Sequence, residues 1–154
     1  MSDWLDALVS KTQQQFEQQR TKEAKFLERA KLKTALGEVF FGDLKKWLKE
    51  NSDKFNRKIE KDVFSVDLNG PRNSVTVRSC PDLTNTWTAT LTYTANAYRI
   101  EINRSPGGTE SYSLDLTADG SRIVALRGNR TNKDNGLSAE MVCQNIMTSM
   151  LLPS

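Results

Sequence analysis

The stretch TWTATLTYT at residues 86–94 carries the clearest structural signal in the sequence. Its larger residues Trp87, Ala89, Leu91 and Tyr93 alternate with five threonines. Strict alternation with a period of two is typical of a β-strand that has one dry face and one wet face. The run therefore predicts a strand in a sheet that is covered on one face.

Similar runs on both sides of this stretch predict further strands. The breaks between them hold turn sequences such as Asn69-Gly70-Pro71 and Asp119-Gly120. Connections this short force neighbouring strands to be antiparallel. One run, residues 123–126, is apolar throughout and indicates a strand that is central or covered on both faces. The other runs lie at residues 64–68, 75–78, 98–103 and 112–116.

Segments with apolar residues at helical spacing lie before and after the predicted strands. From Val39 onward, one predicted helix face holds Phe40, Leu44, Trp47, Leu48, Phe55 and Ile59. Gly37 and Gly42 are expected to loosen the helix, and Asn51-Ser52-Asp53 to end it and cap a short second one. The last helix, 138–152, is apolar on nearly all sides, which predicts burial. Ser138 is its expected N-cap.

Together these patterns predict the α+β class. We expect a two-layer sandwich of N-terminal helices, an antiparallel meander of about six strands, and a buried C-terminal helix. Residues 10–25 contain only one large apolar side chain, Phe16, and so have little to bury. We therefore expect residues 1–25 to form an N-terminal helical arm and residues 26–154 a single domain.

The composition argues against an enzyme. The 154 residues include no histidine and two cysteines, with a net charge of +3. Histidine is the commonest general base and transition-metal ligand, so Ser-His-Asp, Cys-His and His-based zinc sites are excluded. Two cysteines cannot form a four-cysteine site in one chain. We expect no catalytic residue, metal or cofactor. Cys80 and Cys143 are expected to be small buried thiols, with a disulfide between them left open.

Three carboxylates share the polar face of the predicted sheet: Asp67, Glu101 and Asp115. A pair of them could act as general acid and base only with a defined separation and one raised pKa. Cross-strand ion pairs with Arg78 and Arg99 are the commoner arrangement, and we expect that one.

The most function-like feature is a small apolar patch near the N-terminus, formed by Trp4, Leu5, Leu8 and Val9. A tryptophan-anchored patch on one side of a helix is typical of a helix that docks into a groove of a partner. The patch could equally fold back into its own core. The favoured function is a non-enzymatic protein-interaction or adaptor module, self-associating or docking a protein partner through this helix.

Two other functions remain open. One is a cup for a small apolar ligand between sheet and helices, lined by Trp87, Tyr93, Tyr98, Tyr112 and Met147. The other is weak binding to nucleic acid or an anionic surface, because residues 11–61 carry a net charge of about +6. Its candidate residues are Lys45, Lys46, Lys49 and Arg57.

Neither a secretory signal nor an apolar stretch of membrane-spanning length is visible in the sequence. We therefore expect a cytoplasmic protein with a protein partner or a second copy of itself.

Overall fold

The structure, a computed structural model, describes residues 3–81, 85–128 and 136–151. The chain forms two compact units, Met1–Lys33 and Thr34–Ser154. The division lies later than the boundary after residue 25 that the sequence led us to expect. Helix α1, Asp3–Ile59, contributes to both units.

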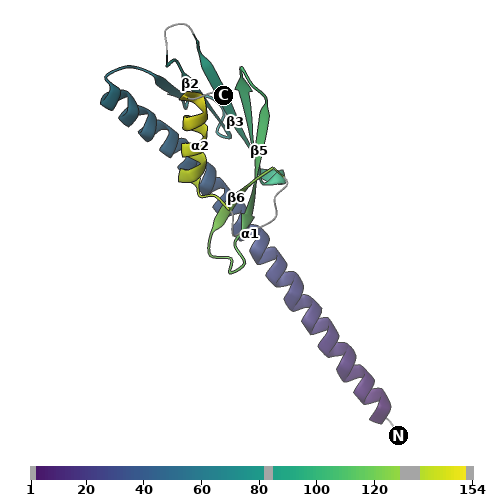
Figure 1. The fold of residues 1–154 in the computed structure, drawn as a ribbon. Coiled ribbons are helices and arrows are strands. Elements are labelled where there is room, and N and C mark those ends of the chain that lie inside the picture. Colours follow the sequence, from purple (N-terminus) through teal and green to yellow (C-terminus); the bar gives the residue numbers. More distant parts are fainter. Residues whose placement is uncertain (1–2, 82–84, 129–135, 152–154) are drawn as a thin grey trace. The chain divides into compact units, whose positions relative to one another are not determined.

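The unit Thr34–Ser154 is built on a six-stranded sheet in which each strand pairs antiparallel with the next along the chain (Figure 1). The strands are β1 Phe64–Asp67, β2 Ser74–Ser79, β3 Trp87–Thr94, β4 Arg99–Ser105, β5 Thr109–Leu116 and β6 Ile123–Arg127. A short 3-10 helix, η1 Ala95–Ala97, joins β3 to β4. The predicted α+β class and antiparallel meander are confirmed.

The register puts apolar residues opposite one another on a single face of the sheet. Leu91 on β3 lies opposite Ile102 on β4, and Leu114 on β5 lies opposite Ala125 on β6. All four are at most 2% exposed. The intervening side chains, mostly threonine and serine, are half-buried or exposed. The alternation read at residues 86–94 therefore corresponds to one dry face and one wet face.

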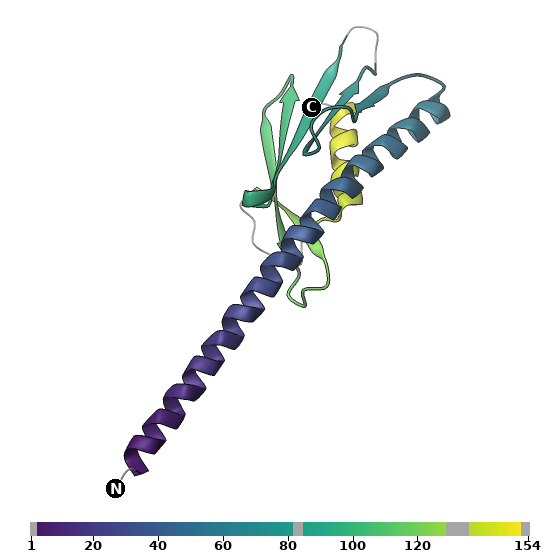
Figure 2. The same cartoon turned by 180° about the vertical axis from the view of Figure 1, so that it is seen from behind.

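Two helices close the dry face: α1 and α2, Ala139–Leu151. Figures 1 and 2 show α2 beside the part of α1 that belongs to this unit. Both helices contribute to the same buried cluster as the strands, through Phe40, Phe41, Leu44, Leu48, Val142, Cys143, Ile146 and Met150. Ser138 caps α2 as predicted, because its Oγ accepts a hydrogen bond from the Met141 N–H at 3.3 Å.

Helix α1 is continuous, so the predicted helix end at residues 51–53 is wrong, and the loosening expected at Gly37 and Gly42 does not interrupt the helix. Gly37 is buried in the helix rather than loosening it. The Asn51 side chain donates to the Trp47 carbonyl at 2.8 Å within the helix, instead of capping a new one. Ser52 is 1% exposed and faces the core. Asn51 and Ser52 are residue types that favour helix caps, but here they lie inside a helix that is held by tertiary packing.

The end of α1 lies at Ile59, where the backbone turns left-handed. Glu60 has φ = 58°, and the Lys61 N–H donates to the Asn56 carbonyl at 3.1 Å. This six-to-one hydrogen bond is the Schellman arrangement that satisfies a helix's last carbonyls. Ile59 itself is 50% exposed, so the apolar face expected to reach it stops earlier.

Strand β6 is the last strand of the sheet, so the central position allowed for it is wrong. Its burial on both faces is as expected, because Ile123, Val124, Ala125 and Leu126 are all buried. The outer edge is also paired, since Ala125 and Leu137 exchange two backbone hydrogen bonds at 2.8 Å. An edge strand covered in this way does not offer free hydrogen-bonding groups at that point.

Gly37 lies at a close approach between α1 and the sheet. A Cβ atom at this position would collide with the hydroxyl oxygen of Tyr93, whose ring stacks on Phe41 with centroids 5.5 Å apart. In the described part of the chain the buried Tyr93 hydroxyl has no hydrogen-bond partner. Glycine is therefore needed here for space and not for backbone conformation.

We predict that Gly37→Ala destabilises the protein by about 1–2 kcal/mol, because overpacking outweighs the helix propensity of alanine. In a Tyr93→Phe background the colliding oxygen is gone, and Gly37→Ala should become neutral or stabilising. Gly42→Ala is the control, since a Cβ there meets nothing within 4 Å, and it should stabilise by about 0.5–1 kcal/mol. Urea unfolding of the variants measures all three. Additive effects of Gly37→Ala and Tyr93→Phe would contradict the proposed collision.

Candidate functional site

The unit Met1–Lys33 exposes large apolar side chains along α1. Trp4 and Phe26 are the most exposed, at 70% and 72%. A soluble helix normally hides its apolar face, so a row of exposed apolar side chains is a candidate docking surface. The full set is Trp4, Leu5, Leu8, Val9, Phe16, Phe26, Leu27 and Leu32.

Seven of these eight side chains share one side of the helix. At 3.6 residues per turn, steps of three and four residues return to the same side. Leu5, Val9, Phe16 and Phe26 fall along this line, with Leu32 on another side of the helix. We call the shared side the apolar helix face, formed by Trp4, Leu5, Leu8, Val9, Phe16, Phe26 and Leu27.

The apolar helix face contains the predicted patch and extends beyond it. The four predicted residues, Trp4, Leu5, Leu8 and Val9, are each at least 46% exposed. Phe16, Phe26 and Leu27 were not assigned to this surface from the sequence, because the polar residues between them hid the pattern. The signal was the continued three-and-four spacing, which persists through the glutamine-rich stretch at residues 13–19.

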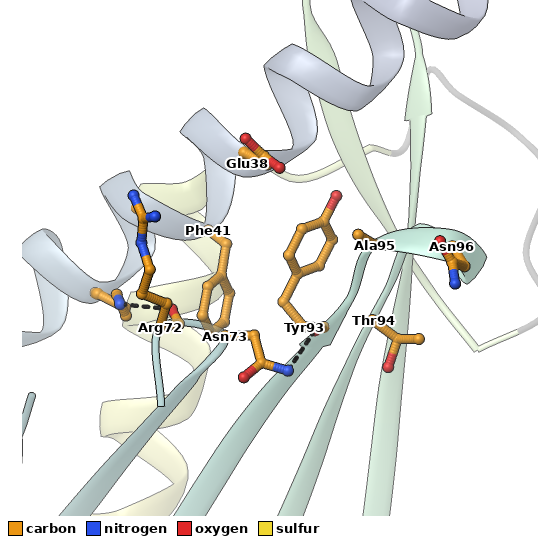
Figure 3. Close-up of a pocket in the computed structure, with 10 residues that line it drawn as sticks. Glu38, Phe41, Arg72, Asn73, Tyr93, Thr94, Ala95 and Asn96 are labelled. Carbon is orange, nitrogen blue, oxygen red and sulfur yellow. Dashed lines mark hydrogen bonds between the residues drawn. The ribbon is translucent and has the colours of Figure 1, made fainter. Parts of the chain in front are cut away.

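A pocket of about 530 Å³ lies in the unit Thr34–Ser154, where α1 passes the ends of β2 and β3 (Figure 3). Tyr93 and Phe41 form its apolar side, and Glu38 stands on α1 near the Tyr93 hydroxyl. Lys45 Nζ donates to the Arg72 carbonyl at 2.9 Å and lies 5.6 Å from the centre of the Phe41 ring. Burial, and then the charge of Glu38, raise the pKa of Tyr93.

The five residues predicted to line a ligand cup are not brought together by this pocket. Tyr93 is the only one of them that lines it. Met147 lines a different pocket of about 340 Å³, together with Phe55 and other residues of α1 and α2. Tyr112 is fully buried in the core. Trp87 and Tyr98 are half-buried against the core cluster.

The four predicted anion-binding residues are partly engaged within the chain. Lys45 is tied to the Arg72 carbonyl. Lys49 forms an ion pair with Asp53 at 3.3 Å, one helical turn away. Lys46 and Arg57 are exposed. Two of the four ammonium or guanidinium groups thus already have a partner in the folded protein.

A charged cluster that sequence reasoning missed sits at the margin of the dry face. The Glu110 carboxylate accepts a hydrogen bond from Arg104 Nη2 at 3.0 Å and forms an ion pair with Arg127 Nε at 3.1 Å, through different oxygens. Arg104 also donates through Nη1 to Ser149 Oγ on α2. Burial, and then the charge of Glu110, raise the pKa of the neighbouring Tyr112. The cluster joins three strands to the last turns of α2.

The sequence contained a signal for this cluster. On β4, Arg104 points to the same face as the buried Ile100 and Ile102, because alternate residues of a strand share a face. On β5, Glu110 shares the dry face with Tyr112 in the same way. A basic and an acidic residue that both break the apolar pattern, on strands joined by a short turn, indicate a buried pair. Of the three carboxylates predicted on the polar face, Asp67 and Glu101 lie exposed on the wet face, and Asp115 is half-buried.

Both cysteines are free thiols. Cys143 is buried, and this burial raises its pKa to about 11. Its thiol is therefore protonated and unreactive near neutral pH. Cys80 is half-buried.

Within residues 3–81, 85–128 and 136–151 no group of three or more potential metal-ligating side chains comes together. In the same ranges neither helix combines the length and the hydropathy that crossing a bilayer requires. Comparison of the chain with protein-family models, with curated proteins and with solved structures gave no match.

We predict that Glu110→Gln lowers the stability of the protein by about 1–3 kcal/mol, because two arginines lose their counter-charge in a half-buried site. The matched control is Asp53→Asn, which removes the carboxylate of the exposed Lys49 pair and should cost less than about 0.5 kcal/mol. Thermal and urea unfolding give both values. Equal losses for the two variants would show that the cluster contributes no more than a surface ion pair.

Proposed function

We propose that the protein is a non-enzymatic interaction module that self-associates through the apolar helix face of residues 3–33. The exposure of Trp4 and Phe26, at 70% and 72%, is the observation that supports this most directly. Large aromatic side chains are the residues that most often dominate the energy of protein interfaces. Their arrangement at helical spacing favours a helix as the binding element.

The free energy available from this surface supports association. Fully burying one large apolar side chain stabilises by about 1.5–3 kcal/mol. The seven side chains of the apolar helix face are only partly buried in the isolated chain. Covering most of them on both copies would release on the order of 10 kcal/mol, which can offset much of the roughly 4–15 kcal/mol cost of lost translational and rotational freedom.

The non-enzymatic character rests on the side chains available for chemistry. The chain has no histidine to act as a general base at neutral pH. The charged groups around Glu110 link strands to α2. The free thiols Cys80 and Cys143 suit a reducing compartment such as the cytoplasm.

We predict that the intact chain, of 17.4 kDa, shows a molar mass that rises towards twice this value as its concentration increases. The double variant Val9→Asp/Phe26→Asp should remain monomeric, because each substitution places a charge on the apolar helix face. Size-exclusion chromatography with multi-angle light scattering measures the mass.

The control is Gln14→Asp/Gln18→Asp, which adds the same charge on the opposite side of the same helix. It should associate like the unmodified chain. An intact chain that remains at 17.4 kDa throughout the concentration range, or a control variant as monomeric as the test variant, would contradict the proposal.

A further inference from the structure

We propose that two copies of helix 3–33 pair antiparallel, in the register where the numbers of facing residues add up to about 35. This inference rests on the self-association proposed above and specifies its geometry. It concerns only the unit Met1–Lys33, all of whose described residues belong to α1.

The spacing of the apolar helix face defines the seam. Alternate steps of four and three residues are the pattern of a helix that packs along a partner helix. In residues 5–33 this pattern selects Leu5, Val9, Thr12, Phe16, Gln19, Glu23, Phe26, Ala30 and Lys33. Apolar residues occupy the first two seam positions and positions 26 and 30, just before Lys33, and polar residues occupy much of the middle.

Antiparallel pairing brings the two apolar ends together. With facing numbers that add up to 35, Val9 of one copy faces Phe26 of the other, and Leu5 faces Ala30. The apolar segment near the N-terminus thereby covers the apolar segment before Lys33, twice in each dimer. Trp4 and Leu27 lie beside these layers and can extend the buried surface.

The polar middle of the seam also favours the antiparallel direction. In this register Glu23 faces Thr12 of the second copy, and Phe16 faces Gln19. An in-register parallel pair would instead place Glu23 directly against Glu23. Two like charges at a helix seam are destabilising, whereas a carboxylate that faces the uncharged Thr12 side chain meets no like charge.

The charge distribution along the helix points the same way. Residues 3–16 contain Asp3, Asp6 and Lys11, and so carry a net charge of −1. Residues 17–33 contain six lysines or arginines and three glutamates, and so carry +3. Antiparallel pairing sets the acidic segment of each copy against the basic segment of the other, whereas parallel pairing would set +3 against +3. Complementary charges of this kind select the orientation of a pair.

The direction can be measured with nitroxide spin labels at two exposed positions on the side of the helix away from the seam. Ala7→Cys and Gln18→Cys are made separately in full-length chains that carry Cys80→Ser, with the buried Cys143 left in place. In the antiparallel register the two Gln18 positions lie almost level, whereas the two Ala7 positions are separated by about 30 Å along the helix axis. Double electron–electron resonance reads both separations.

We expect a clearly longer separation for the Ala7 labels than for the Gln18 labels. Two equally short separations would mean a parallel pair, which overturns this inference but leaves self-association through the helix intact. Two long separations would mean that dimers form through another surface, which overturns both. Light scattering on each labelled chain verifies that the dimer is present, so a missing dipolar signal from a confirmed dimer counts as a long separation.

Discussion

Burial of one face of the sheet beneath α1 and α2 is the constraint on which the rest of this structure depends. The strands contribute a layer of side chains such as Leu91 and Ile102, both completely buried. The helices contribute Leu44, Leu48 and Ile146 to the same cluster. Because side chains alternate along a strand, this single contact decides the register of the whole meander. A slip by one residue would expose the entire layer.

The polar groups at the margin of this layer act as its boundary. Glu110 holds Arg104 and Arg127 where the dry face ends, and Arg104 reaches Ser149 on α2. The Tyr93 hydroxyl enters the layer beside Gly37. The ion pairs explain why a glutamate, Glu110, occupies a dry-face position of a strand. The Tyr93 hydroxyl explains why a glycine, Gly37, occurs within a helix.

Much of the fold could be predicted from the sequence because local and tertiary preferences agree in the sheet. The threonine alternation around Leu91, the turn sequences and the Ser138 cap each correspond to an observed element. The continuity of α1 could not be predicted from the sequence. Gly37 and Asn51 favour helix breaks in isolation, and only packing against the core keeps them helical. The position of β6 was ambiguous for a similar reason. A wholly apolar strand has both faces covered, but this does not say whether it is central.

The candidate site was predictable in part. Trp4, Leu5, Leu8 and Val9 were recognised as a patch because they are close in sequence. Their extension through Phe16 to Phe26 was missed, because polar residues dilute the pattern. One helix thus contains residues whose apolar side chains are satisfied by their own sheet, such as Leu44, and others, such as Phe26, that are exposed.

The most direct test of this contrast is amide hydrogen exchange along α1 at low and high protein concentration. Amides between Phe40 and Ser52 should exchange slowly at every concentration, because the core of the same chain protects them. Amides between Leu5 and Ala30 should exchange more slowly as the concentration rises, because a second copy covers them. Exchange in residues 5–30 that does not depend on concentration would contradict self-association through this helix.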